Sequence, residues 1–250
     1  MLDLARLERI KLRRRPPMQI LIAQLILRFD YSLPRPTSIK LEGVDNIPRD
    51  RGVIFAMNHT DRYNYWPFQY QMYRQALPRF TATWVKGKYY ENKMMGAFMD
   101  STNNIPLPSR GYVITTEFRK AHGRVPNEAE YRALRELVDG SGDPATVAAG
   151  GEAVKALIEK GGPAATYRER FDALFMSMMA QVTRLTREAL FERELNVLIF
   201  PQGTRSKRLS RGHGGMMQMA QHLGAAIVPV GCNGSDRAYP GGSPLSKGGK

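Results

Sequence analysis

The chain has 250 residues, enough to bury a core within one domain, and its 37 Lys and Arg against 23 Asp and Glu give a net charge of +14. This balance favours binding to an anionic partner, such as a membrane surface, a phosphorylated substrate or nucleic acid. The alternative is a generally basic soluble surface without such a partner. The single cysteine, Cys232, excludes an internal disulfide and a cysteine-rich metal site. The four histidines lack the spacing of a zinc site, so we expect no metal site. We also expect no resident cofactor.

Residues 1–33 are expected to be helical and to form a segment of their own. The apolar stretch 18–28 is about half as long as the ~20 residues of a membrane-spanning helix. Basic residues 11–15 precede it, but Gln19 and Gln24 interrupt it and no small-residue cleavage site follows, which argues against a signal peptide. The pattern favours an amphipathic helix in a membrane interface, and a helix docked on the core is the alternative.

Strand and helix patterns alternate through residues 34–250, which predicts an α/β fold. Short apolar runs bounded by turn residues predict strands at 39–41, 53–57, 80–85, 104–107, 196–200 and 225–230. Helices are expected at 64–75 and 216–222, with a helical insertion at about 120–190 whose last part, 167–193, has an apolar stripe.

The strand at 53–57 ends in Asn58 and His59, in a position where ligands are bound in α/β folds. A histidine that acts as a base needs a partner on its other ring nitrogen, which fixes its tautomer. Asp61 and Asn64 follow closely enough to be that partner. The residues alone do not choose between them.

The strand at 196–200 runs into a turn set by Pro201 and Gly203. The turn presents the hydroxyl of Thr204 and the guanidinium of Arg205 next to backbone N–H groups. Such a turn is a plausible phosphate cradle. Together, the two strand ends predict a phosphate anchor and a general base in one protein.

These blocks resemble motifs of the glycerolipid acyltransferase family, which includes the lysophosphatidate and glycerol-3-phosphate acyltransferases. Residues 58–64 resemble its Asn-His-x-x-x-x-Asp motif, and residues 200–206 resemble its Phe-Pro-Glu-Gly-Thr-Arg-Ser motif. Two weaker blocks follow the family's order, at 104–110 and 227–230. The resemblance covers roughly residues 39–110 and 195–240.

The resemblance implies a mixed central sheet flanked by helices, and a His59 base that activates a hydroxyl for attack on an acyl thioester. It implies acyl-CoA or acyl carrier protein as donor and a lysophosphatidic acid-like acceptor, at the cytoplasmic face of a membrane with anionic lipids. The phosphate site implied by the resemblance consists of Gly203, Thr204, Arg205, Arg110 and Gln202. Lys86 and Lys88 are possible helpers, or simply solvated lysines.

The chain departs from the family in both principal motifs, because Asn64 replaces the Asp and Gln202 replaces the Glu. An amide oxygen can orient a histidine but supplies no negative charge for the imidazolium. The alternative function is therefore a weakened or inactive acyltransferase fold that binds anionic lipid or a partner. Nucleic-acid binding is disfavoured, since the sequence has no zinc-finger, RRM or KH signature.

Two further departures concern length. The insertion at 120–190 separates blocks that lie closer together in compact family members, and we expect it to cover the acyl groove or to bind a partner. The chain also stops soon after the 225–230 strand, where the family usually continues, so we expect a truncated end. The sequence does not predict an oligomeric state.

Overall fold

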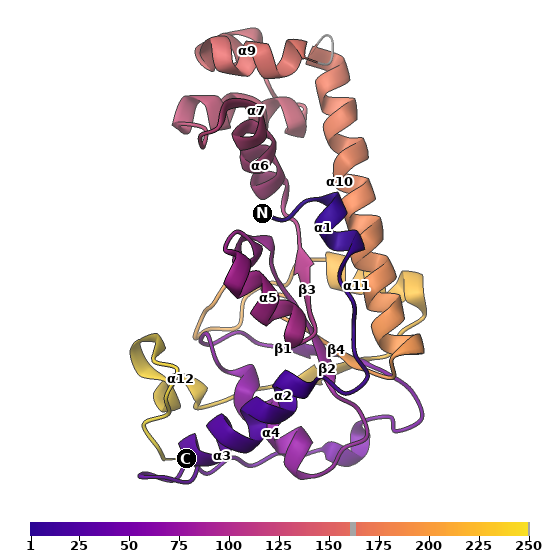
Figure 1. Cartoon of the computed structure of the whole chain (residues 1–250), viewed down its shortest axis with the longest axis vertical. Coiled ribbons are helices and arrows are strands. Elements are labelled where there is room, and N and C mark those ends of the chain that lie inside the picture. Colours follow the sequence, from indigo (N-terminus) through magenta and orange to yellow (C-terminus); the bar gives the residue numbers. More distant parts are fainter. Residues whose placement is uncertain (161–163, 250) are drawn as a thin grey trace. The chain divides into compact units, whose positions relative to one another are not determined.

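The computed structural model describes residues 1–160 and 164–249 (Figure 1). The chain divides into two compact units, each built from three segments of the sequence. Unit 1 comprises residues 1–10, 85–96 and 106–182, and unit 2 comprises residues 11–84, 97–105 and 183–250.

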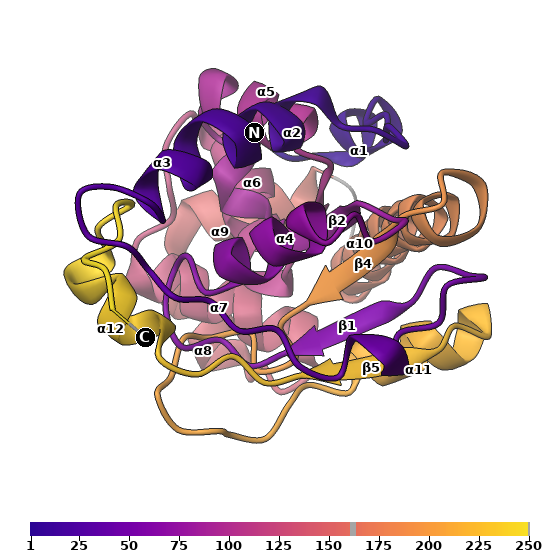
Figure 2. The same cartoon turned by 90° about the horizontal axis from the view of Figure 1, so that it is seen from below.

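A five-stranded sheet, carried mainly by unit 2, has the order β3-β2-β4-β1-β5, and Figure 2 labels four of its strands, β2, β4, β1 and β5. Its strands are β1 (Ile54–Met57), β2 (Thr81–Lys86), β3 (Asn104–Leu107), β4 (Asn196–Ile199) and β5 (Ile227–Val230). β1 pairs in parallel with β4 and β5, and β4 pairs in parallel with β2. The expected α/β class is confirmed, with a parallel sheet where a mixed one was expected.

The composition of the strands explains their places in the sheet. β1 and β4 lie inside it and are almost wholly buried, as continuous apolar runs in parallel sheets are. The two edge strands each contain a proline, Pro106 in β3 and Pro229 in β5. Proline lacks the N–H that a second neighbouring strand would need, so edge positions suit it.

The helical elements of unit 2 precede and follow these strands in the sequence. They are α2 (Pro17–Leu21), a π-helical turn (Ile22–Leu27), α3 (Arg28–Asp30), 3-10 turns (Val44–Asn46 and Pro240–Gly242), α4 (Tyr65–Arg74), a π-helical turn (Glu188–Glu192), α11 (Gly215–Leu223) and α12 (Ser235–Ala238). Phe68 and Met72 of α4 pack against Phe55 and Leu198 in the core. The strand expected at 39–41 is absent, and the Ile39 carbonyl instead accepts a hydrogen bond from the Gln71 side chain.

The segment from α2 to α3 docks on unit 2 by one face. Ala23 and Leu27 are buried in a cluster with Tyr70, and the Gln19 amide donates to the carbonyls of Thr81 and Thr102, each at 2.8 Å. The opposite face and the turn after α3 together expose five large apolar side chains. They are Leu21, Leu25, Ile26, Phe29 and Leu33, which are 46–65% exposed. Within the described ranges, no helix has the length and hydrophobicity to cross a membrane.

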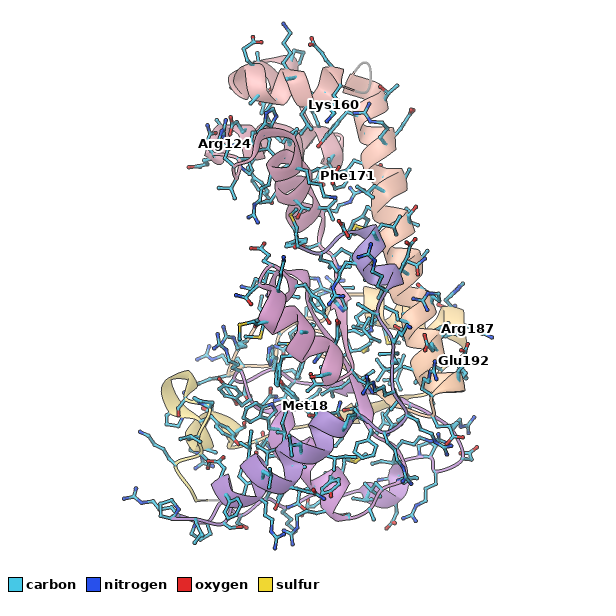
Figure 3. The ribbon with its side chains drawn as sticks, viewed as in Figure 1. Met18, Arg124, Lys160, Phe171, Arg187 and Glu192 are labelled. Carbon is cyan, nitrogen blue, oxygen red and sulfur yellow. The ribbon has the colours of Figure 1, made fainter. Side chains whose placement is uncertain are left out.

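Unit 1 is mostly helical and includes residues 120–182 of the range 120–190. It includes α1 (Leu4–Glu8), a 3-10 turn (Gly87–Tyr90), α6 (Arg110–His122), α7 (Glu128–Asp139), α8 (Pro144–Ala149) and α9 (Gly151–Glu159). α5 (Lys93–Ser101) and α10 (Ala164–Arg187) belong partly to each unit. The guanidinium of Arg124, labelled in Figure 3, forms two hydrogen bonds with the carboxylate of Glu130. This pair and the Asn127 capping box fix the start of α7.

Candidate active site

The candidate site lies in unit 2, where three neighbouring strands end. β1 leads into Asn58 and His59, β4 leads into the turn at 200–206, and β5 leads into Cys232. Because β1 pairs in parallel with both β4 and β5, their carboxyl ends meet at one edge of the sheet. Ligands in open α/β sheets bind at this edge.

Two backbone groups of His59, its N–H and its carbonyl, form hydrogen bonds with the turn at residues 200–206 that follows β4. The backbone N–H of His59 donates to Oε1 of Gln202 at 3.3 Å, and the N–H of Ser206 donates to the His59 carbonyl at 2.8 Å. The turn therefore passes directly beside the histidine. Two sequence blocks more than 140 residues apart form one local structure.

Asn64 contacts the His59 ring. Its Oδ1 lies 3.1 Å from Nδ1 of His59, and its Nδ2 donates to the Asn58 carbonyl at 2.6 Å. A carbonyl only accepts hydrogen bonds, so the NH₂ group of Asn64 must face Asn58 and the amide oxygen must face the ring. Nδ1 then carries the proton, and Nε2 is left with the lone pair that a general base requires.

The side chain of Asn58 ties β1 to β5. Its Nδ2 donates to the Cys232 carbonyl at 2.9 Å, and its Oδ1 accepts the Cys232 N–H at 2.7 Å. The Cys232 thiol also donates to the Asn64 carbonyl at 3.3 Å. Burial, with a contribution from the nearby Asp61 carboxylate, raises the pKa of Cys232 to about 11, so the thiol keeps the proton that it donates.

The His59 ring also packs against an aromatic residue of the motif at 200–206. The His59 ring stacks on Phe200, the residue before the turn, with centroids 4.1 Å apart and planes at 25°. The ring of Tyr65 lies edge-on to the same phenylalanine, with ring centroids 6.1 Å apart. Such contacts restrict ring rotation and add to the orientation that Asn64 provides.

Asp61 has another set of partners. Its carboxylate accepts the N–H of Tyr63 at 2.7 Å and the hydroxyl of Thr60 at 3.0 Å. These contacts shape the loop that leads from His59 to α4. Of the two expected partners for the histidine, the one within hydrogen-bonding distance of Nδ1 is Asn64.

The turn after β4 exposes groups that suit an anion. Gly203 has φ +65°, and a Cβ there would lie 3.2 Å from the His213 ring, so only glycine fits comfortably. Thr204 and Arg205 are exposed, and their backbone N–H groups donate to no other group in the part of the chain that the structure describes. The two N–H groups and the Arg205 guanidinium are donors of the kind that bind anions, and the Thr204 hydroxyl lies 3.5 Å from the Gln202 carbonyl oxygen.

Gln202 differs from its neighbours because its side chain points inward. It is 5% exposed, and besides accepting from His59 its Nε2 donates to Ser210 Oγ at 2.9 Å and to the Arg208 carbonyl at 3.3 Å. Both ends of the amide are thus used within the protein. Gln202 links the His59 backbone to the loop after the turn.

Three other residues expected at the site belong to unit 1. The Arg110 guanidinium pairs with Asp172 and Asp139, and it lies over the rings of Phe171 and Phe175. Two carboxylates already compensate its charge. Lys86 ends β2 and Lys88 lies in the following 3-10 turn, and both side chains are exposed.

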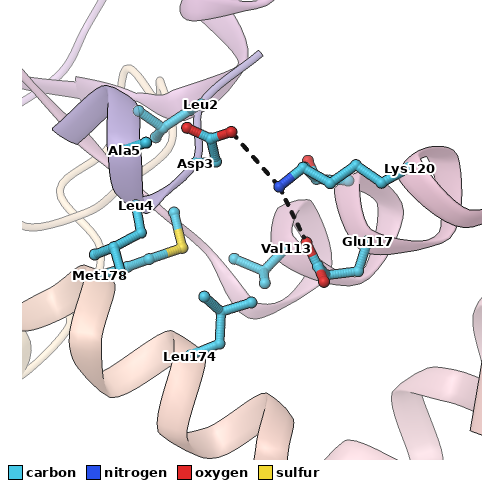
Figure 4. A pocket seen from close by; sticks show the side chains of 10 residues that line it. Leu2, Asp3, Leu4, Ala5, Val113, Glu117, Lys120, Leu174 and Met178 are labelled. Carbon is cyan, nitrogen blue, oxygen red and sulfur yellow. Dashed lines mark ion pairs between the residues drawn. The ribbon is translucent and has the colours of Figure 1, made fainter. Parts of the chain in front are cut away.

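Each unit also has a hollow of its own. In unit 1 a cavity of about 190 Å³ is mostly aliphatic, with Lys120 between Asp3 and Glu117 (Figure 4). In unit 2 a groove of about 70 Å³ lies between the π-helical turn at 22–27 and α4, and its walls include Tyr65 and Trp66. Among the described residues, no group of three or more His, Cys, Asp and Glu side chains could hold a metal ion.

Sequence reasoning did not assign the roles of Asn58 and Cys232. Cys232 indicated only the absence of an internal disulfide and of a cysteine-rich metal site. Its contact with residues 58 and 64 depends on the pairing of β1 with β5. The position of Asn58 beside His59, at the end of a buried strand, was the available signal.

Comparison with known proteins gives one match. Residues 157–233, less than a third of the chain, match the family model "Acyltransferase". Neither the curated proteins nor the solved structures contain a match. The matched range includes β4, the turn, α11, β5 and Cys232, whereas the His59 block lies outside it. The match supports the acyltransferase superfamily and a transferase activity in general.

Proposed function

We propose that this acyltransferase-like protein transfers a fatty acyl group from an acyl thioester to the hydroxyl of a phosphorylated glycerolipid, such as lysophosphatidic acid. The observation that carries the proposal is the pair of hydrogen bonds that holds His59 against the turn at 202–206. A base and an anion-binding surface are then close enough to act on the two ends of one small acceptor.

In this mechanism Nε2 of His59 removes the proton of the acceptor hydroxyl. The oxygen attacks the thioester carbonyl carbon, and the C–S bond breaks when the tetrahedral intermediate collapses. The imidazolium returns its proton to the departing sulfur, so the histidine is regenerated and a free thiol is released. The acceptable donors are acyl-CoA and acyl carrier protein thioesters, since both present the same reactive group.

The acceptor phosphate is proposed to bind at the turn formed by Gly203, Thr204 and Arg205. The N–H groups of Thr204 and Arg205, the Thr204 hydroxyl and the Arg205 guanidinium are the proposed donors, whereas the Gly203 N–H donates to the Phe200 carbonyl. A phosphate held beside His59 adds negative charge near the imidazolium. This charge partly replaces the carboxylate that Asn64 lacks. A phosphorylated acceptor therefore suits this site better than an uncharged one.

The acyl chain is proposed to enter the groove of unit 2, which begins at Tyr65, directly after Asn64. Most of its lining residues are aromatic or aliphatic, which suits a methylene chain, and five amide or hydroxyl residues also line it. At about 70 Å³ the groove holds only part of a fatty chain. The remainder would extend towards lipid.

A membrane surface is the proposed setting for this chemistry. The exposed apolar face of residues 17–33 and the net charge of +14 suit peripheral binding to anionic lipid, which is concentrated in the cytoplasmic leaflet.

The test is a thioester-release assay with a panel of lysophospholipid acceptors, in which product is identified by mass spectrometry. His59→Ala should abolish transfer while the far-UV circular dichroism stays unchanged. His222→Ala removes an exposed histidine at the end of α11 and should keep full activity. Full turnover in the His59 variant would refute the mechanism.

A second candidate function is binding of anionic lipid without turnover. It is favoured by the amides at 64 and 202, because a carboxylate at either position would face the carbonyl of Asn58 or of Arg208. The surroundings thus suit amides rather than the family's acids. Vesicle binding without thioester release for any acceptor or donor would support this function over acyl transfer.

A further inference from the structure

The loop between β4 and α11 carries a concentrated positive charge. Residues 204–211, here called the cationic loop, include the exposed side chains of Arg205, Lys207, Arg208 and Arg211. The sequence has no Asp or Glu between Glu194 and Asp236. Among the ion pairs of the described residues, the loop contributes one, between Lys207 and Asp236 at 3.2 Å.

Hydrogen bonds hold the cationic loop in a defined shape. The Gln202 amide bonds Ser210 and the Arg208 carbonyl, and Ser206 Oγ accepts the Arg208 N–H at 3.1 Å. The N–H of His213 donates to the Pro201 carbonyl at 2.8 Å and closes the base of the loop. Figure 2 shows the loop as the orange trace that runs outside β1 and β5. The loop therefore presents its side chains in a set arrangement.

Leu209 lies among these cations and is 83% exposed. An apolar side chain in water forgoes the stabilisation that burial would provide. Against the phosphates of a nucleic acid, Leu209 would have no apolar surface to contact. At a bilayer interface, the leucine enters the apolar region while the neighbouring guanidinium groups bind lipid phosphates.

We propose that the cationic loop is a docking surface for an anionic lipid bilayer, with Leu209 inserted and Arg208 and Arg211 on the headgroups. The proposal extends the proposed function, because the loop begins at Thr204 and Arg205 and its docking brings the His59 site to a lipid acceptor. Binding to vesicles is measured without turnover, so its failure and the failure of acyl transfer are separate results.

The test is co-sedimentation of the full chain with phosphatidylcholine vesicles, with and without phosphatidylglycerol. Leu209→Ser should lower the partition coefficient about tenfold. Arg208→Gln with Arg211→Gln should lower it roughly 25-fold on the anionic vesicles, since each charge is worth about fivefold. Binding to pure phosphatidylcholine should be weak for every variant.

Matched controls remove similar groups elsewhere on unit 2. Arg49→Gln with Arg51→Gln removes the same charge, and Leu245→Ser removes another exposed leucine, which is 61% exposed. Both should change binding less than about twofold. Unchanged thermal melting of the loop variants shows that they are folded.

Two results would overturn the proposal. One is an equal loss in the loop variants and the controls, which would mean that only net charge matters. The other is normal vesicle binding by the leucine variant together with equal losses of vesicle and duplex DNA binding by the arginine variant. That pattern would describe a general polyanion surface.

Discussion

Asn64 and Asp61 are the two candidates for orienting the His59 ring, and replacing each by alanine separates them. Asn64→Ala removes the oxygen 3.1 Å from Nδ1 and the NH₂ group that bonds the Asn58 carbonyl. Asp61→Ala removes only contacts to Tyr63 and Thr60 within the loop. We expect the Asn64 variant to lose far more activity.

The structure gives the size of the effect. Asn64 is fully buried, and its loss deletes two hydrogen bonds and leaves a buried carbonyl without its donor. At about 1 kcal/mol for each bond and about 1–3 kcal/mol for the unpaired acceptor, the free energy of unfolding should fall by about 3–5 kcal/mol. Loss of a partner that orients a metal-ligating histidine costs about 10- to 100-fold, and by analogy we expect kcat to fall by at least that factor. Asp61→Ala should lower kcat by less than about threefold, since its lost bonds are worth about 1 kcal/mol each and mostly affect stability.

The assay follows thiol release under saturating donor and acceptor, over a range of pH, at a temperature where each variant is folded. The expected signature of Asn64→Ala is a lower kcat with little change in KM and an altered pH dependence, because the base itself is disturbed. Asp61→Asn, which keeps the acceptor oxygen, should behave like the parent protein. A larger loss in Asp61→Ala than in Asn64→Ala would refute this reasoning and give the orienting role to Asp61.

Two further predictions concern titratable groups. Since the pKa of Cys232 is raised to about 11, iodoacetamide should alkylate it roughly 100-fold more slowly than free cysteine at pH 8, and the rate should keep rising up to about pH 11. Asp61→Asn should shift this pH profile of the alkylation rate to lower pH. A profile like that of free cysteine would contradict the buried contact. The pKa of Glu130 is lowered to about 2, chiefly by Arg124, so the pair should stabilise unit 1 fully above about pH 4 and progressively less as pH falls towards 2. Arg124→Gln should therefore move the midpoint of acid unfolding, followed by circular dichroism at 222 nm, to higher pH, whereas an unchanged midpoint would show that the pair contributes nothing.

Much of the fold was predictable because its signals are local. The strands at 53–57 and 196–200 are short apolar runs ended by turn residues, and both occur within one residue of those ranges. The strand predicted at 39–41 was wrong, because three residues with two apolar side chains do not distinguish a strand from an extended loop. Its carbonyl at Ile39 bonds a side chain of α4, which no local pattern encodes.

The site was predictable in part for the same reason. His59 and Arg205 stand in recognisable blocks, and their position after strands indicated one sheet edge. The role of Gln202 was not predictable, because its inward direction depends on Arg208 and Ser210 after the turn. Asn58 and Cys232 likewise acquire their roles only through contacts between strands that are distant in sequence.

The sequence by itself determined the α/β class and the excess of positive charge. It also showed amides at two positions where the glycerolipid acyltransferase family, which the chain resembles, has Asp and Glu. These properties follow from composition, hydrophobic periodicity and residue identity, which do not depend on long-range contacts. Tertiary structure decided that Asn64 faces Nδ1, that Gln202 serves the loop and that Arg110 is held by two carboxylates. Hydrogen bonds and ion pairs depend on distances of a few ångströms, and those distances are set only when the parallel strands and the helices pack.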